Sequence, residues 1–220
     1  MHFFVPDLTQ TVYNGDFVRH FFSMRIQSKQ ICKICDLKGR LAEIEILEVN
    51  KKNNFITVKI LKNYQKLKPE EKILYQAVLD RNYLDKLVEI APLSGITKIY
   101  FFFGDYSIKY NLNLERLNKI LIRSCEQGQI AFLPEIKLIT KSELLENIKN
   151  QLVVVLDIVD KFETSQKIQI LQKYQSIIVG CEGGFSPAEK EIFSSLTKIN
   201  LGETVYPGWL AGFVHFSQKI

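Results

Sequence analysis

GCEGGFSPAEKEIF, residues 180–193, joins two adjacent glycines to an acidic residue on one side and a Ser-Pro pair on the other. Ser186 and Glu189 have the spacing of a capping box, and the proline after Ser186 suits the first position of a helix. The stretch therefore predicts a helix that begins directly after Ser186. Gly183 and Gly184 allow a positive φ or the close approach of a ligand. They indicate either a ligand-binding loop or a tight turn without a ligand.

The loop lacks the features of phosphate-binding loops. No Gly-Lys-Ser/Thr sequence ends it, which excludes a Walker A motif, and no G-x-G-x-x-G follows a predicted strand. The acidic Glu182 would also repel a phosphate. A cofactor with a cationic centre and a ribose fits this loop better.

The composition is that of an ordinary globular protein. The chain has 220 residues, of which 46% are apolar and 24% are charged. No apolar run reaches the ~18 residues that a membrane span needs. The start, MHFFVPDLTQ, lacks the basic and apolar regions of a signal peptide. We expect a cytoplasmic protein without a membrane partner.

The positive charge is concentrated in the first third of the chain. Residues 1–68 contain 12 Lys/Arg and 6 Asp/Glu, whereas the remaining residues contain 17 and 18. This asymmetry indicates either an N-terminal part that binds a polyanion such as RNA or DNA, or a solvated lysine-rich surface.

Four cysteines are present, and Cys32 and Cys35 form a single CxxC. A zinc or redox site would need further ligands, but there is no second CxxC and no His pair at ligand spacing. In the strand expected here, positions three apart point to opposite faces. We expect reduced, structural cysteines and no metal.

Residues 1–68 are expected to form a small β-barrel. Short segments rich in β-branched and aromatic residues alternate with turn signals such as Asn14-Gly15-Asp16. The polar segment 65–72, which contains Pro69, is the expected linker. The predicted strands are 18–25, 29–39, 40–50 and 54–63.

After residue 72, strand and helix patterns alternate, which predicts a largely parallel sheet with helices on both faces. The runs VVVL and IIVG are continuously apolar, as in strands that are buried on both faces. The predicted strands are 73–79, 97–103, 135–139, 152–157, 176–180 and 198–202. The predicted helices are 80–91, 114–127, 142–150 with Ser142 as N-cap, 166–174 and 187–196, followed by the apolar stretch 208–218.

Ligands of parallel sheets bind at the carboxyl ends of the strands. Three predicted strands end in polar or glycine-containing loops, at 156–157, 180–184 and 200–202. We expect these loops to lie together.

Several motifs in this order resemble the ribosomal RNA small subunit methyltransferase E family. IIVGCEGGFSPAEKEIF resembles the family motif IGPEGGFSxxE, and the following INLG resembles its S-L-G loop. VVLD resembles the strand before the cofactor loop, and LERLNKILIRSCEQ with LPEI resembles a helix ending in E-Q and a later P-E strand. RHFFSMR and DLKGR resemble N-terminal elements of the family. The resemblance covers nearly the whole chain, and its glycine motif is the specific part.

The resemblance implies an α/β fold of the SPOUT class, with a trefoil-knotted parallel sheet in a methyltransferase domain at 69–220 and an RNA-binding, PUA-like β-barrel at 1–68. It also implies methylation of N3 of a uridine in small-subunit (16S) ribosomal RNA by S-adenosylmethionine. The implied partners are ribosomal RNA or the small ribosomal subunit, and a second copy of the chain, with the knot at the interface of a homodimer.

The site residues follow by motif match. In the implied site, the cofactor is lined by Leu156, Gly180, Glu182, Gly183, Leu201, Gly202 and Val205. The implied RNA contacts are Arg19, His20 and Arg25.

The sequence departs from the family where catalytic charge is expected. Thr204 and Pro207 replace two arginines after S-L-G, and residues 208–210 replace a Thr-Glu-Thr. Uridine N3 must lose its proton, so the charge that develops on the ring needs a nearby cation or hydrogen-bond donor. Arg123, Arg116 or Arg81 could supply the charge from elsewhere, and Arg123 and Glu126 are the candidate catalytic residues. The alternative is a catalytically impaired RNA- or ribosome-binding relative.

Aromatic residues occupy this divergent segment. Tyr206 and Trp209 are expected either to pack in a subunit interface or, in a SPOUT enzyme with a changed substrate, to stack on a different base.

Overall fold

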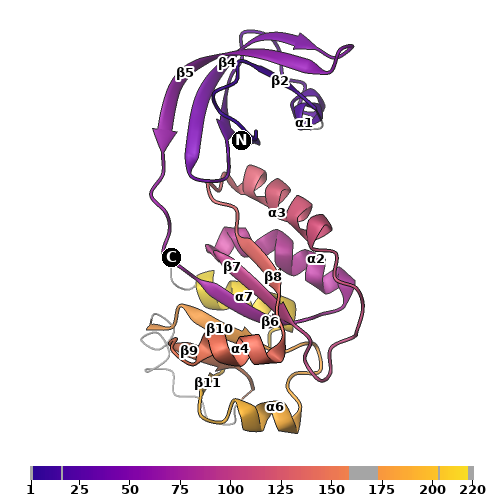
Figure 1. The fold of residues 1–220 in the computed structure, drawn as a ribbon, viewed down its shortest axis with the longest axis vertical. Helices are drawn as coiled ribbons and strands as arrows, with labels where there is room; N and C mark the ends of the chain where they lie inside the picture. The colour runs from indigo at the N-terminus through magenta and orange to yellow at the C-terminus, as the bar shows by residue number, and fades with distance from the viewer. Residues whose placement is uncertain (1, 16, 159–172, 203, 218–220) are drawn as a thin grey trace. The chain divides into compact units, whose positions relative to one another are not determined.

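The computed structural model describes residues 2–15, 17–158, 173–202 and 204–217. The chain divides into two compact units, each built around its own β-sheet (Figure 1). The N-terminal unit comprises Met1–Lys68 with Ile122–Leu133, and the C-terminal unit comprises Pro69–Leu121 with Pro134–Ile220.

The N-terminal unit contains a curled five-stranded sheet in the order β1-β3-β4-β5-β2. Its first and third strands pair in parallel, and the other pairs are antiparallel. Alternate residues of the two long strands, such as Ile44 and Val58, are buried, as expected for a sheet with one face on a core. The strands are β1 (His2–Phe4), β2 (Val12–Asn14), β3 (Ile31–Cys35), β4 (Arg40–Asn50) and β5 (Phe55–Gln65).

The prediction of a strand at residues 18–25 is wrong, because this segment contains the helix α1 (Val18–Ser23). Val18 and Phe21, three residues apart, are both fully buried, which is a helical and not an alternating pattern. The ring of Phe21 stacks on that of Phe3 at 3.9 Å. Burial of these rings outweighs the strand propensity of the segment.

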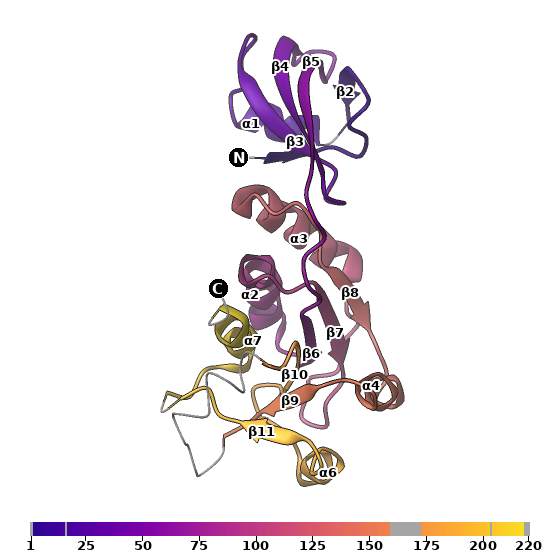
Figure 2. The same ribbon diagram turned by 90° about the vertical axis from the view of Figure 1, so that its left-hand side faces the viewer.

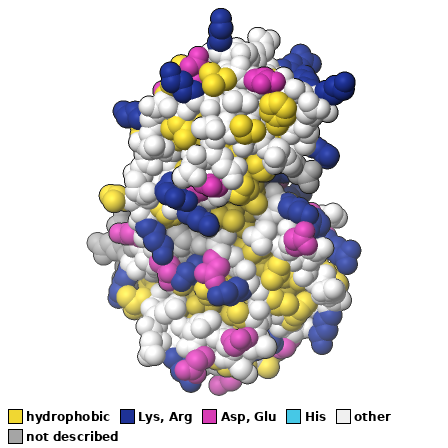
Figure 3. Space-filling model, turned by 45° about the horizontal axis from the view of Figure 1, so that its top comes forward, with side chains coloured by type: hydrophobic (Ala, Val, Ile, Leu, Met, Phe, Trp, Pro, Cys, Tyr) yellow, Lys and Arg dark blue, Asp and Glu magenta, His cyan; other side chains and the backbone are white. Residues whose placement is uncertain are grey.

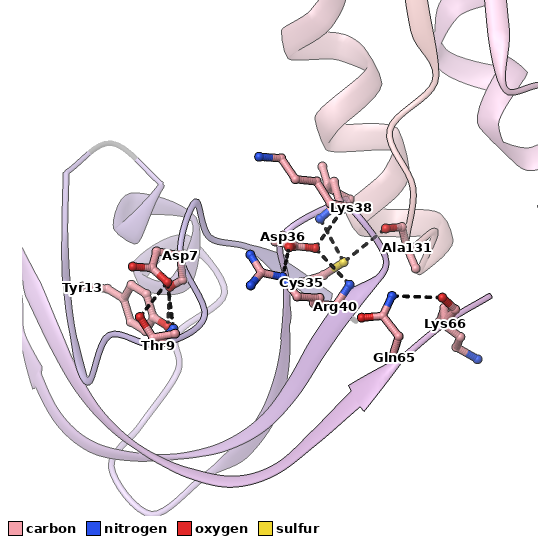
Figure 4. A network of polar contacts seen from close by, with 11 residues as sticks. Asp7, Thr9, Tyr13, Cys35, Asp36, Lys38, Arg40, Gln65, Lys66 and Ala131 are labelled. Atoms are coloured by element: carbon pink, nitrogen blue, oxygen red, sulfur yellow. Dashed lines mark hydrogen bonds and ion pairs between the residues drawn. The ribbon is translucent and has the colours of Figure 1, made fainter. Parts of the chain in front are cut away.

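The cysteines of this unit are buried or half-buried thiols. The Cys35 thiol donates a hydrogen bond to the carbonyl oxygen of Ala131 at 3.7 Å (Figure 4). In the adjacent turn, the Asp36 carboxylate accepts three hydrogen bonds, one from Lys38 and two from Arg40. Burial raises the pKa of Cys32 to about 11 and that of Cys125 to about 12, so these thiols stay protonated and unreactive. Within the described ranges, no group of three His, Cys, Asp or Glu is placed to hold a metal ion.

The C-terminal unit contains a six-stranded sheet in the order β11-β9-β10-β6-β7-β8, in which every pair is parallel. The prediction of an α/β fold with a parallel sheet is therefore confirmed. All residues of the apolar strands β9 and β10 are buried, as the sequence predicts. The strands are β6 (Ile73–Ala77), β7 (Lys98–Phe102), β8 (Glu135–Leu138), β9 (Val153–Leu156), β10 (Ser176–Val179) and β11 (Thr197–Ile199).

Helices cover both faces of this sheet. Figure 2 shows α2 and α7 on one side and α4 and α6 on the other. The predicted helix at 166–174 lies mostly outside the described residues. No helix in the described part of the chain has both the length and the apolar character needed to cross a membrane. The helices are α2 (Arg81–Ile90), the 3₁₀ turn η1 (Ala91–Ser94), α3 (Leu114–Gly128), α4 (Lys141–Ile148), α6 (Pro187–Ile192) and α7 (Gly208–Ser217).

Two of the described helices begin with capping boxes. The predicted box of Ser186 and Glu189 is confirmed at the start of α6. The prediction of Ser142 as the N-cap of α4 is wrong, because Thr140 is the N-cap and forms a capping box with Glu143. Both Thr140 and Ser142 are acceptable caps by type, but only Thr140 has an acidic residue three positions later.

Candidate functional site

Three strand ends meet at one edge of the parallel sheet. Strands β10, β9 and β11 are neighbours, so their carboxyl ends lie side by side. A cavity of about 470 Å³ lies at these ends. It is lined by residues of 156–158, 179–185, 199–201 and 204–209, together with Tyr83, Lys190 and Ala211.

The glycine stretch forms a tight turn at this cavity. The Gly184 N–H donates to the carbonyl oxygen of Cys181 at 2.9 Å, and Gly184 has a φ of +70°. A Cβ on Gly180 would lie 3.0 Å from the carbonyl carbon of Gly184, which is too close. Gly180 and Gly184 are thus required by the turn itself, and the turn also lines a cavity that can hold a ligand.

A buried amide fixes the first carbonyl of this turn. The Gln76 side chain is fully buried in β6, and its Nε2 donates to the carbonyl oxygen of Gly180 at 2.9 Å. A Cβ on Gly208 would lie 3.0 Å from the same oxygen, so the start of α7 packs directly against it. The Oε1 atom of Gln76 finds no hydrogen-bond partner among the described residues. Gln76 therefore orients the turn at the expense of a buried, unsatisfied acceptor.

Glu182 anchors the outer part of the turn. Its Oε1 accepts a hydrogen bond from the backbone N–H of Asp80 at 2.9 Å. Asp80 is the N-cap of α2, so the carboxylate lies at the amino end of that helix, where the helix dipole favours negative charge.

The cavity contains one pair of opposite charges. Asp157 follows β9, and its Oδ2 lies 3.7 Å from Nζ of Lys190 on the opposing α6. Lys190 is the one Lys or Arg among the described residues that line the cavity. At the end of β11, Oδ1 of Asn200 accepts a hydrogen bond from the Gly202 N–H at 2.9 Å.

A network of charged side chains around the buried Glu189 supports α6. The Glu189 carboxylate is nearly fully buried and accepts from Lys141 Nζ at 2.7 Å and from the Asp105 N–H at 3.0 Å. The Ser186 hydroxyl bonds to the other carboxylate, Asp105. Hydrogen bonds from Lys141 and Ser186 lower the pKa of Asp105. Burial opposes the charge of Lys141, but its bonds to Asp105 and Glu189 outweigh this and raise its pKa.

An aromatic group forms another part of the lining. Tyr83 of α2, Tyr206 and Trp209 of α7 all line the cavity. The Lys86 ammonium lies 5.5 Å from the ring centroid of Tyr83 and 5.5 Å from that of Trp209. One cation thus contacts rings from two neighbouring helices.

The cavity gathers most of the residues implied as cofactor contacts. Leu156, Gly180, Glu182, Gly183, Leu201 and Val205 line it, whereas Gly202 is not among the lining residues of the described chain. Gly202 instead binds Asn200 through its backbone N–H.

The two candidate catalytic residues belong to the other unit. Arg123 is exposed on α3, and Glu126 is buried. Oε1 of Glu126 accepts from the Phe4 N–H at 2.8 Å and lies 3.1 Å from Nδ1 of His20. These bonds give Glu126 a structural role in the N-terminal unit.

The implied RNA contacts also belong to the N-terminal unit. Arg19 and Arg25 are exposed, and His20 is half-buried against Glu126. Lysine and arginine side chains occur in separate groups on the face seen in Figure 3, with acidic side chains between them. Net charge alone therefore does not locate an RNA surface on this face.

The site residues that were not anticipated include Gln76, Tyr83 and Lys190. Gln76 carried a usable signal, because it is the one polar side chain in the apolar run ILYQAVL. Tyr83 and Lys190 carry no local signal, since only the packing of α2 and α6 brings them to the cavity.

The parallel sheet with a cavity at its strand ends defines an α/β protein whose ligand site is built from strand-end loops. The chain belongs to the RNA methyltransferase domain family, whose model matches residues 66–206.

Individual relatives agree with this assignment. The chain is 28% identical over 190 residues to a ribosomal RNA small subunit methyltransferase E of Helicobacter pylori, covering 81% of this chain and 80% of that protein. A crystal structure of the Neisseria gonorrhoeae methyltransferase E bound to S-adenosylmethionine matches with a TM-score of 0.84 and 18% identity, over 98% of this chain and 94% of that one. The Legionella pneumophila candidate methyltransferase Lpg2936, in complex with the same cofactor, matches with a TM-score of 0.82 and 18% identity, over 98% and 95%. These structures show that the whole fold is shared.

Proposed function

We propose that this protein methylates N3 of a uridine in small-subunit ribosomal RNA and takes the methyl group from S-adenosylmethionine. The observation that carries the proposal is the cavity formed by three strand-end loops in a chain of the RNA methyltransferase family. The methyltransferase E of Helicobacter pylori and the cofactor-bound Neisseria structure support the choice of substrate and cofactor.

The residues of the cavity fit this cofactor. A volume of about 470 Å³ lies within the range of ligand pockets, roughly 300–1,000 Å³. The turn at 180–184 would hold the cofactor by backbone groups, and Asp157 and Asn200 offer side-chain oxygens for its hydroxyl and amino groups. Gln76 keeps the turn in place. When bound, the cofactor supplies an electrophilic methyl group.

Lys190 would supply the positive charge that the reaction needs. Uridine N3 becomes nucleophilic only when its proton leaves, and a cation in the cavity stabilises the resulting negative charge. Lys190 lines the cavity, and Asp157 holds its ammonium group. Arg123 remains a second candidate for this task. Glu126 is acidic and could serve only to accept the N3 proton, and its structural bonds make it a weak candidate for that.

The N-terminal unit would bind the RNA. Its basic excess supports this role, and Arg19, His20 and Arg25 are the proposed contacts. We further propose that residues 1–68 form a PUA-like domain and residues 69–220 a knotted SPOUT domain, which forms a homodimer through the knot. A ribosomal substrate would place the protein in the cytoplasm.

A second function is a catalytically impaired relative that binds RNA or the ribosome. It is favoured by Thr204 and Pro207, which stand where the resemblance implies arginines and contribute no charge to the cavity lining. This candidate predicts RNA binding without methyl transfer.

Two measurements test the proposal. Calorimetry with S-adenosylmethionine should show binding, and a variant with Gly180→Val should lose it, because the side chain would clash with Gly184. Labelled methyl transfer should then be measured on deproteinised small-subunit RNA and on assembled subunits. Cofactor binding with no methyl incorporation into either substrate would favour the second function, RNA binding without catalysis. Absence of cofactor binding would overturn the proposed enzymatic function.

A further inference from the structure

The aromatic part of the cavity has its own chemistry. Tyr83, Tyr206 and Trp209 place three rings at the same cavity as the glycine turn. Trp209 is half-buried, so part of its indole is open to a ligand. Helices α2 and α7, which carry Tyr83 and Trp209, lie side by side in Figures 1 and 2 and pack on each other.

Lys86 joins the two helices at this point. Its ammonium group lies at the same distance, 5.5 Å, from the rings of Tyr83 and Trp209. Because Lys86 is exposed, each of these contacts is weak, so the shared cation favours this arrangement of the two rings before a ligand arrives but does not fix it.

The lining of the cavity therefore has two chemically different parts. The strand-end part offers backbone groups, a glycine turn and the oxygens of Asp157 and Asn200. The second part offers aromatic rings. Methyl transfer needs both reactants in one cavity with the reacting atoms about 3–3.5 Å apart. If the cofactor occupies the strand-end part, the aromatic part is left for the acceptor.

We propose that Tyr83, Tyr206 and Trp209 form a stacking subsite for the unpaired nucleobase that accepts the methyl group, with Lys86 positioning the rings. This inference rests on the proposed function and adds the way in which the acceptor is held. An aromatic surface suits this task because every base presents a flat π-face, and a base must leave its stack before an enzyme can reach it. The base is thus held by stacking, and Lys190, which pairs with Asp157, is not needed to hold it.

Trp209 gives a direct readout, because it is the only tryptophan of the chain. The full chain is titrated with a short oligouridylate, with and without saturating S-adenosylmethionine, while tryptophan emission is followed. Stacking predicts quenching that saturates with the oligonucleotide even when the cofactor is already bound. If the cofactor alone quenches the tryptophan emission and the oligonucleotide causes no further quenching, the rings hold the cofactor and the proposal is wrong. It is also wrong if neither ligand changes the emission.

Variants separate stacking from structure. Trp209→Ala should weaken oligouridylate binding, measured by fluorescence anisotropy of labelled RNA, by about tenfold or more, whereas Trp209→Phe should restore most of the affinity. Calorimetry should give the same affinity for S-adenosylmethionine in all three proteins. Tyr100→Ala is the matched control. It removes an aromatic ring whose centroid lies 5.8 Å from the Lys137 ammonium group, but Tyr100 does not line the cavity, so RNA affinity should be unchanged.

Two results distinguish the possible failures. If Trp209→Ala alters only the sedimentation coefficient and leaves RNA affinity intact, Trp209 is a subunit contact and the subsite is overturned. If the wild type binds no S-adenosylmethionine, the proposed function fails, whatever the variants show.

Discussion

Gln76 shows how one buried side chain can set the shape of a binding loop. It lies in a central strand, is fully buried, and donates to the carbonyl oxygen of Gly180, which is distant in sequence. Its unsatisfied Oε1 is a cost that a purely structural position would avoid, since leucine would fill the same space. The position is therefore better explained by the loop than by the core.

Replacing Gln76 with leucine should weaken cofactor binding. The Gly180 carbonyl would lose its buried donor, a cost of about 1–3 kcal/mol of unfolding free energy that removal of the unsatisfied Oε1 partly offsets, and the turn would loosen. Urea unfolding and calorimetry with S-adenosylmethionine measure the two effects. Tyr75→Phe is the control, because it removes a hydrogen bond to Gln151 from the same strand and should lower stability without changing cofactor affinity. Unchanged cofactor affinity in Gln76→Leu would show that the turn does not depend on this bond.

Lys190 is the second side chain on which the proposed function depends. Lys190→Met should lower the rate of methyl transfer by about tenfold or more, because it removes the one Lys or Arg of the described cavity lining, which we propose stabilises the developing charge. Cofactor affinity should change less than the rate. Lys149→Met removes an exposed lysine that pairs with Glu146 on α4, and it should leave the rate intact. Equal rates of methyl transfer in the two variants would show that another residue stabilises the developing charge, and Arg123 would be tested next.

Helix α6 begins shortly after the glycine turn and carries Lys190, so its N-cap can affect the position of both. Ser186→Ala and Thr140→Ala remove equivalent caps from α6 and α4, and each should lower the unfolding free energy by about 1 kcal/mol. Only Ser186→Ala should also weaken cofactor binding, because α6 adjoins the cavity. Calorimetry on the two variants is the measurement. An equal loss of cofactor affinity in both would indicate general destabilisation.

The network below α6 predicts how stability changes with acid. Asp105 has a pKa below its ordinary value of 3.8, because Lys141 and Ser186 donate to it, so folding favours its ionised form. The stabilisation is therefore present above pH 3.8 and is lost as the pH falls through the lower, folded pKa. Asp105→Asn should reduce the slope of unfolding free energy against pH below this value. An unchanged slope, measured by chemical unfolding at a series of acidic pH values, would contradict the assignment.

Much of the C-terminal unit could be predicted from the sequence, because its elements are locally encoded. Composition predicts the apolar strands β9 and β10, and the spacing of Ser186 and Glu189 predicts the capping box of α6. The strand ends could then be expected to meet, since parallel strands share one carboxyl edge.

The remaining features depend on tertiary packing. The helix α1 forms in a segment of strand-like composition because Phe21 stacks on Phe3. The N-terminal unit includes Ile122–Leu133, which a boundary drawn along the chain does not reveal. Tyr83 and Lys190 reach the cavity only through the packing of α2 and α6.

The whole molecule combines an RNA methyltransferase fold with a cavity in which Lys190 is the cation of the described lining. Whether this arrangement catalyses methyl transfer is best measured directly. The purified chain is incubated with S-adenosylmethionine and small-subunit ribosomal RNA, free and in assembled subunits, and the RNA is digested to nucleosides for mass spectrometry. The account predicts 3-methyluridine, with a yield that falls in Lys190→Met. Cofactor binding without 3-methyluridine in either substrate would contradict it.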